Sequence, residues 1–176
     1  RYRNAAGFMD DILATFLSRI DLSNTIVLIT GDHGESIFDD GVLSHSSRLS
    51  EIQTRVPMLV VGPGIPKRSI DQATSHLDVL PTLLHALTGN SMPLRKSCGR
   101  SLLNAPELDR MLLFQGTSQS GPLELLLIDG NRRLRVDLAR DGELTAVGFL
   151  DERAQLQNID SQDAENWVES LGEELK

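Results

Sequence analysis

Two neighbouring residues near the start of the sequence have side chains that can bind a metal ion. Asp32 and His33 offer a carboxylate oxygen and an imidazole nitrogen, which is a common ligand pair for Zn²⁺ or Mn²⁺. Gly31 and Gly34 flank the pair and would let the backbone bend so that both side chains reach one ion. In the alternative, Asp32 caps a following helix and His33 makes only local hydrogen bonds. We favour the metal site, with Ca²⁺ or Mg²⁺ as less favoured occupants because they prefer oxygen ligands.

Two further polar groups lie close to this pair in the sequence. His45 stands twelve residues beyond His33 and could donate a hydrogen bond to an anionic phosphoryl or sulfuryl oxygen. On its spacing alone, His45 is more simply explained as an exposed loop histidine. Glu35 could orient a metal-bound histidine, or it could be a first-turn carboxylate near a helix N-terminus.

We interpret the other histidines and the cysteine as structural. His76 precedes a predicted helix and would orient either Asp78 or the loop before it. His85 would lie at the polar edge of that helix. Cys98 is the only cysteine, so no internal disulfide can form.

The elements that must position the candidate metal ligands follow from the hydrophobic pattern. Residues 4–20 have apolar side chains at every third or fourth position, which predicts an amphipathic helix. Residues 25–30 form an uninterrupted apolar run, typical of a parallel strand buried on both faces. The ligand pair would then emerge at the carboxyl end of this strand, where open α/β sheets carry functional groups. Residues 36–55 are predicted to form a long loop with one short helix, and residues 56–61 a second strand.

A second helix is predicted over residues 79–88. Asp78 would be its N-cap, and Gly89 would end it as the residue after the last turn. Its leucines would face the core: Leu80, Leu83, Leu84 and Leu87.

The pattern changes after residue 110. Short β-like runs with Asp-Gly turn signals between them predict a small antiparallel meander, at residues 111–115, 123–128, 132–136 and 145–149. Residues 163–171 would form a terminal helix. The fold is therefore predicted to be α/β, with parallel strands and flanking helices in residues 1–105, and a β-rich extension with a terminal helix in residues 106–176.

Composition narrows the possible functions. The 176 residues are 40% hydrophobic and 24% charged, which is typical of a folded domain rather than a disordered chain. The net charge of −8, from 17 basic and 25 acidic residues, disfavours nucleic acid as a partner. The chain starts without methionine, and we expect it to be part of a longer protein.

Four motifs in order resemble the sulfatase-like hydrolases and transferases of the alkaline-phosphatase superfamily. The first covers residues 1–35 and ends in GDHGE; the second is RVPMLVVGPG at residues 55–64. The third is SHLDVLPTLL at residues 75–84, and GRSL follows at residues 99–102. Together the motifs extend over roughly residues 1–103.

The resemblance implies an alkaline-phosphatase-like sandwich and the transfer or hydrolysis of a sulfate or phosphate ester. In that family a Ser, Thr or modified Cys attacks the ester, and a divalent metal neutralises the ester oxygens. Asp32 and His33 match the late pair of metal ligands. His45 matches, by spacing, a histidine that contacts the substrate in the phosphoethanolamine-transferase branch. The family's nucleophile and early acidic ligand lie before the position of Arg1, so the missing N-terminal half of the domain is an expected partner.

The sequence also departs from the usual sulfatase pattern. Many sulfatases pair the late Asp with Asn and place a Lys before the Arg-Val-Pro run, whereas here the partner is His33 and no Lys occurs between Asp32 and Pro57. These differences favour a phosphotransferase-like or membrane-anchored relative. The residues after Cys98 lack the signal for conversion of cysteine into the sulfatase nucleophile, so we interpret Cys98 as an ordinary residue.

Several expectations follow for the chain and its parent protein. By resemblance, the parent would be extracytoplasmic, either periplasmic or membrane-anchored. The chain alone should bind metal weakly, catalyse nothing and tend to self-associate through exposed apolar surface. The alternative to an enzyme is a non-catalytic sulfatase-like sensor or scaffold.

Overall fold

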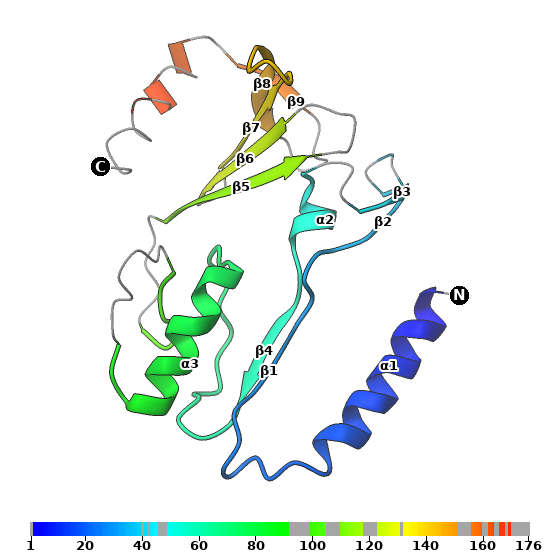
Figure 1. Cartoon of the computed structure of the whole chain (residues 1–176), viewed down its shortest axis with the longest axis vertical. Helices are drawn as coiled ribbons and strands as arrows, with labels where there is room; N and C mark the ends of the chain where they lie inside the picture. The colour runs from blue at the N-terminus through cyan, green and yellow to red at the C-terminus, as the bar shows by residue number, and fades with distance from the viewer. Residues whose placement is uncertain are drawn as a thin grey trace. The chain divides into compact units, whose positions relative to one another are not determined.

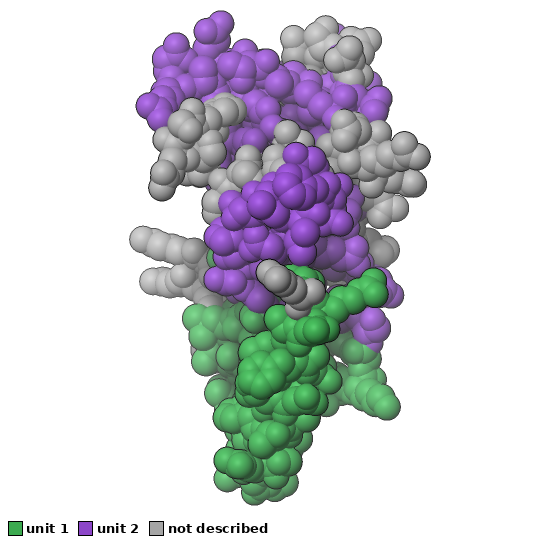
Figure 2. Space-filling model, turned by 90° about the vertical axis from the view of Figure 1, so that its right-hand side faces the viewer, with its two compact units in different colours: residues 1–30, 58–68, 77–104 green, residues 31–57, 69–76, 105–176 purple. Residues whose placement is uncertain are grey.

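Figure 1 draws the computed structural model of the chain, which divides into the two compact units that Figure 2 shows in different colours. One unit contains residues 1–30, 58–68 and 77–104, and the other contains residues 31–57, 69–76 and 105–176. The predicted domains, 1–105 and 106–176, stay a prediction. The structure describes residues 2–39, 41, 43–45, 49–91, 99–104, 110–117, 123–130, 132–150, 156–159, 162–163, 166–167 and 169.

The first unit begins with the predicted amphipathic helix. Helix α1 runs Tyr2–Leu17, and its apolar stripe is largely exposed, with Phe8 at 65% and Phe16 at 53% of their full accessibility. No helix among the described residues is both long and apolar enough to cross a membrane.

Strands β1 (Val27–Thr30) and β4 (Met58–Val61) confirm the two predicted apolar strands, but their predicted parallel direction is wrong. They pair antiparallel in a two-stranded sheet, with Val27 opposite Val61 and Thr30 opposite Met58. The physical reason is that an uninterrupted apolar run indicates contacts on both faces of a strand, and says nothing about strand direction.

Helix α3 (Val79–Thr88) forms where it was predicted and ends at Gly89, which has a positive φ of 72° and donates its N–H to the carbonyl of His85. Asp78 stands at the N-cap position, as predicted, but the predicted hydrogen bond from the first turn to its side chain is absent. A 3-10 turn, η1 (His76–Asp78), continues directly into the helix, so Asp78 has helical φ and ψ and its side chain caps nothing. Two of the predicted core leucines, Leu80 and Leu87, are instead 55% and 72% exposed.

Buried polar groups tie α3 to the segment that follows it. Asp78 is fully buried, and its Oδ1 accepts the backbone N–H of Arg100 at 2.8 Å. Thr82 donates its hydroxyl to the carbonyl of Asp78 and accepts the N–H of Leu102 at 2.9 Å. Because each buried donor or acceptor has a partner, these contacts hold the helix to the chain without leaving an uncompensated polar group.

The second unit contains the predicted antiparallel meander, with one strand more than the sequence indicated. The strands lie side by side in chain order: β5 (Met111–Thr117), β6 (Leu123–Asp129), β7 (Arg132–Leu138), β8 (Leu144–Leu150) and β9 (Leu156–Asn158). The Asp-Gly turn signals are confirmed, because Gly130 and Gly142 have positive φ values of 55° and 90°.

The core of this sheet gathers around Leu127, Leu134 and Trp167. Phe149 of β8 meets the Trp167 ring edge to face, with ring centroids 5.6 Å apart. Trp167 belongs to the predicted terminal helix. Residues 162, 163, 166, 167 and 169 are helical, and the rest of that helix lies outside the described residues.

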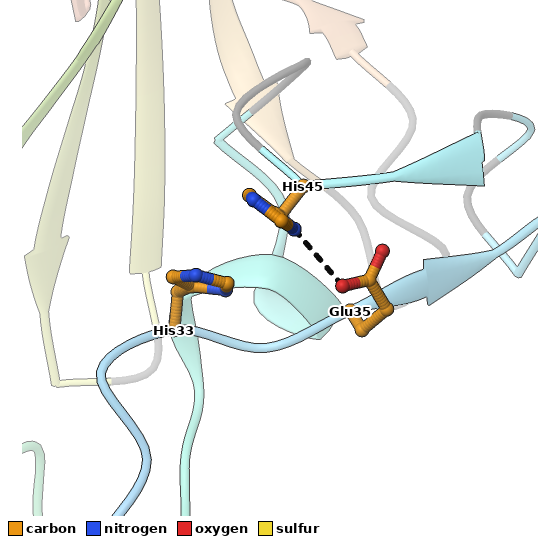
Figure 3. A group of neighbouring side chains, drawn as sticks. All are labelled: His33, Glu35 and His45. Atoms are coloured by element: carbon orange, nitrogen blue, oxygen red, sulfur yellow. Dashed lines mark hydrogen bonds and ion pairs between the residues drawn. The ribbon is translucent and has the colours of Figure 1, made fainter. Parts of the chain in front are cut away.

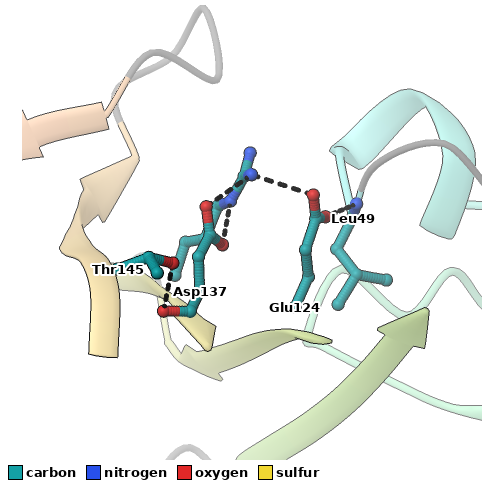
Figure 4. Close-up of polar contacts among 5 residues, drawn as sticks. Leu49, Glu124, Asp137 and Thr145 are labelled. Atoms are coloured by element: carbon teal, nitrogen blue, oxygen red, sulfur yellow. Dashed lines mark hydrogen bonds and ion pairs between the residues drawn. The ribbon is translucent and has the colours of Figure 1, made fainter. Parts of the chain in front are cut away.

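A buried charged cluster connects this sheet to the segment that contains helix α2 (Glu51–Thr54; Figure 4). Arg135 of β7 bonds Asp137 through two nitrogens, at 2.7 and 2.8 Å, and Glu124 of β6 at 2.9 Å. The other oxygen of Glu124 accepts the N–H of Leu49 at 2.5 Å. The sheet therefore holds the backbone just before α2, which Arg133 also reaches through an ion pair with Glu51 at 2.9 Å.

Candidate functional site

A short hairpin positions two of the candidate residues. Strands β2 (Ser36–Ile37) and β3 (Leu43–Ser44) pair antiparallel with Ser36 opposite Ser44. One step outward along this register, Glu35 stands opposite His45, so the two side chains meet across the hairpin. Ser44 has a positive φ of 88°, an unusual conformation for a residue other than glycine.

The loop before the hairpin is packed closely against α2. Gly34 donates its N–H to the carbonyl of Gln53 at 2.8 Å, and a Cβ on Gly34 would lie 1.9 Å from the carbonyl oxygen of Ile52. The φ of Gly34 is not positive, so the backbone conformation here does not require glycine. Glycine is required because a side chain would prevent the close approach of this loop to α2. His76 donates from Nε2 to the carbonyl of Gly31 at 2.8 Å, so it orients this loop, the second of the roles predicted for it.

Asp32 and His33 bring two possible ligand atoms close together. His33 Nδ1 lies 2.9 Å from the carbonyl oxygen of Gly34, and because a carbonyl only accepts, this nitrogen carries the proton of a neutral ring. The other nitrogen, Nε2, is left with its lone pair and lies 3.7 Å from Asp32 Oδ2. Two ligands about 2.1 Å from one ion stand roughly 3.4 Å apart at a tetrahedral angle, so this pair fits a shared cation.

Local hydrogen bonds keep Asp32 ionised. The N–H of Asp32 itself and then the N–H of His33, at 3.0 Å from Oδ1, lower the pKa of the Asp32 carboxyl, and the His33 ring adds a smaller electrostatic effect when it is protonated. A carboxylate that stays charged is the form that binds a metal. The Asp32 side chain is 90% exposed, so a cation could reach it from solvent.

His45 contacts both Glu35 and His33 (Figure 3). His45 Nδ1 lies 2.9 Å from Glu35 Oε2, and the carboxylate accepts a hydrogen bond from this nitrogen. The rings of His45 and His33 face each other with centroids 4.0 Å apart and planes tilted by 30°. His45 is thus brought to the candidate metal ligands, and Glu35 contacts His45 rather than His33.

Sequence reasoning named these residues but missed how they are grouped. The contact between Glu35 and His45 depends on the hairpin, and the serine-rich run around it has no alternating pattern that would predict a strand. His85 is half-buried, with Nδ1 lying 2.9 Å from the hydroxyl of Ser101, which agrees with a structural role. Cys98 lies outside the described residues. The roles of Asp32 and His33 as metal ligands, and of His45 in catalysis, stay predictions.

The family model and the similar proteins of known sequence all indicate the same family. The model of the family named Sulfatase matches residues 1–89. A Caenorhabditis elegans relative, named as an extracellular sulfatase Sulf-1 homolog, is 31% identical over 121 residues, which is 68% of this chain and 17% of that protein. The Δ4,5-hexuronate-2-O-sulfatase of Bacteroides thetaiotaomicron is 32% identical over 93 residues, covering 51% of this chain and 19% of that protein.

A solved structure agrees at the level of fold. A crystal structure from Bacteroides thetaiotaomicron, described as that of a sulfatase, superposes with a TM-score of 0.61 at 20% identity. The match covers 85% of this chain and 35% of that one. The chain spans less than a fifth of the length of the two curated relatives.

Proposed function

The chain belongs to the sulfatase family, and on that basis we propose that it supplies metal ligands to a divalent-metal-dependent sulfuric-ester hydrolase. The observation that carries the proposal is the 3.7 Å separation between Asp32 Oδ2 and His33 Nε2, within the part of the chain that matches the family. Sulfate-ester hydrolysis is favoured over phosphoryl transfer because the relatives described above are sulfatases.

In this proposal, Asp32 and His33 hold the cation. A divalent cation bound there would neutralise the charge of the ester oxygens and stabilise the charge that develops in the transition state. Asp32 contributes a charged oxygen, and His33 contributes Nε2 because its Nδ1 proton is held by the Gly34 carbonyl. This donor set, one oxygen and one nitrogen, favours Zn²⁺ or Mn²⁺.

His45 would act on the substrate. In its doubly protonated form, His45 would bond Glu35 through Nδ1 and donate from Nε2 to an oxygen of the sulfate group. The nucleophile would come from residues outside this chain, in the remaining part of the same domain. The relative named as extracellular supports an extracytoplasmic location for the whole protein.

The test uses metal binding and turnover together. We expect the 176-residue chain to show no turnover, and the full-length protein to contain a divalent metal and to hydrolyse an aryl sulfate faster than an aryl phosphate. Asp32→Ala should lower that turnover by about 100-fold or more, because a metal ligand is lost. The matched control is Asp10→Ala, which removes an exposed carboxylate of α1 and should leave both the metal content and the turnover unchanged. Full activity in Asp32→Ala, or an active protein without metal, would refute the proposal.

A further inference from the structure

Three side chains at the base of the β2–β3 hairpin converge on one region (Figure 3). His33, Glu35 and His45 each present a ligand atom, and these three atoms all lie within 4.8 Å of one another. We propose that the three side chains together hold one divalent cation. The proposal rests on the proposed function only through His33, which both share. It adds Glu35 as a ligand and assigns His45 to the cation instead of the substrate.

The distances within the cluster suit a shared ion. His45 Nδ1 and Glu35 Oε2 are 2.9 Å apart, and on metal binding the Nδ1 proton that Glu35 accepts would move to Nε2, which frees the Nδ1 lone pair for the ion. Ligands about 2.1 Å from an ion stand roughly 3.0 Å apart at a right angle and roughly 3.4 Å apart at a tetrahedral angle. His33 completes the group, because its ligand atom lies within 4.8 Å of those of Glu35 and His45. Rotation of the two exposed imidazole rings would turn their in-plane lone pairs toward one cation.

The backbone that carries these side chains is fixed by contacts independent of any ion. The hairpin register places Glu35 opposite His45. Ser36, which follows Glu35 and pairs with Ser44, is fully buried, and Gly34, which precedes Glu35, donates its N–H to the carbonyl of Gln53 at 2.8 Å. The Gly34 carbonyl in turn fixes the His33 ring. A preformed arrangement of this kind lowers the entropy cost of binding, because the ligand positions are already set.

The chemistry of the cluster selects the ion. Two imidazoles and one carboxylate form a ligand set used by catalytic zinc sites, which keep a further position open. Nitrogen ligands disfavour Mg²⁺ and Ca²⁺, which take oxygen ligands. All three side chains are partly open to solvent, at 43% for His33, 38% for Glu35 and 42% for His45, so an ion and a small anion can both enter.

In the competing interpretation, Glu35 only orients the His45 ring through the hydrogen bond. Glu35→Gln separates the two interpretations. A glutamine side-chain oxygen can still accept a hydrogen bond from His45 Nδ1, but it lacks the charge that makes glutamate a strong metal ligand. If Glu35 is a ligand, this substitution weakens metal binding; if it only orients His45, metal binding stays unchanged.

The experiment titrates the 176-residue chain with ZnCl₂ by calorimetry and with CoCl₂ by visible absorption, which reports the ligands of the bound ion. Glu35→Gln and His45→Asn should each raise the Kd for Zn²⁺ by about tenfold or more, and the cobalt spectrum should lose intensity. Glu143→Gln, at an exposed carboxylate before β8, is the matched control and should leave the Kd unchanged. An unchanged Kd in Glu35→Gln, or no Zn²⁺ binding to the parent chain, overturns the three-residue site.

Asp32→Asn in the same titration keeps this inference separate from the proposed function. If Asp32→Asn raises the Kd while Glu35→Gln and His45→Asn do not, the three-residue site is wrong and the Asp32–His33 pair stands. If only the latter two raise the Kd, the three-residue site stands and Asp32 is not a ligand in this chain. If all three raise it, the ion has four protein ligands, so the Asp32–His33 pair and the three-residue site both stand and only the substrate role of His45 is lost. Backbone amide spectra of each variant confirm that the hairpin is still folded.

Discussion

The buried charged cluster of the five-stranded sheet gives a direct test of what holds the second unit together. Arg135→Met would remove the cation that bonds both Glu124 and Asp137 and leave two carboxylates without their charged partner. The side chains are 14%, 10% and 12% exposed, respectively, so little water can replace the lost bonds. Breaking a buried ion pair by removing one partner costs about 3–5 kcal/mol, and we expect about 3 kcal/mol because some solvent access remains.

A matched substitution on the surface sets the comparison. Arg55 makes one bond to Glu51, at 2.8 Å, and its side chain is 79% exposed. Arg55→Met removes the same charge and adds the same side chain, but it should cost only about 0.5 kcal/mol, because exposed pairs are screened by water. The expected difference of about 2.5 kcal/mol corresponds to a Tm lower by roughly 5–10 °C for a chain of this size.

Thermal and urea unfolding of both variants measure that difference, and amide exchange reports its local consequence. Because Glu124 also accepts the Leu49 N–H, exchange at Leu49 should accelerate in Arg135→Met. The triple variant Glu124→Gln, Arg135→Met, Asp137→Asn should recover part of the loss, since no charge is left unpaired. Equal stability of Arg135→Met and Arg55→Met would refute the reasoning. A triple variant no more stable than Arg135→Met would show that packing rather than charge sets the cost.

Four further substitutions test other parts of the chain. Gly34→Ala should destabilise the chain by about 1–3 kcal/mol in urea unfolding, because its methyl group would overlap the carbonyl oxygen of the neighbouring α2 backbone. Gly7→Ala, where the added methyl group meets nothing, should stabilise α1 by about 1 kcal/mol and raise its helical circular dichroism. Thr82→Val should cost about 1–3 kcal/mol in the same unfolding assay, because a buried hydroxyl that both donates and accepts is lost. The hydroxyl and then the N–H of Ser23 lower the pKa of Asp21, so Ser23→Ala should raise that pKa in an NMR titration. Because the folded-state pKa is lowered, the resulting loss of stability should be present at neutral pH and disappear as the pH falls through that pKa.

Patterns carried by side-chain periodicity could be predicted from the sequence. The apolar stripe of α1, the uninterrupted apolar runs of β1 and β4, and the Asp-Gly turns of the meander each follow from local sequence and were found in the structure. The family could also be predicted, because each of its motifs is a short run of consecutive residues, and the family model matches residues 1–89. In each case the information lies within a few consecutive residues.

Features set by contacts distant in sequence could not be predicted. The direction of β4 relative to β1 depends on the path of the intervening segment, which the apolar runs do not report. Asp78 was expected to cap a helix, because Asp is a common N-cap, but its carboxylate accepts the N–H of Arg100, 22 residues away. The charged residues of β7 carry no local signal that they are buried, and only the pairing with β6 places Arg135 beside Glu124. Strand pairing therefore decided what the side chains contact.

The twelve-residue spacing between His33 and His45 shows the same dependence within the site. Spacing alone allows His45 to lie anywhere on a flexible loop, and only the turn between β2 and β3 fixes its place. In that turn Gly41 donates its N–H to the carbonyl of Phe38 and has a positive φ of 82°, and Ser36 then pairs with Ser44. A register shifted by one residue would send the His45 side chain to the opposite face of the hairpin, away from His33. The site is therefore specified by the geometry of a turn as much as by the Asp-His motif, because the turn decides which groups stand beside His33.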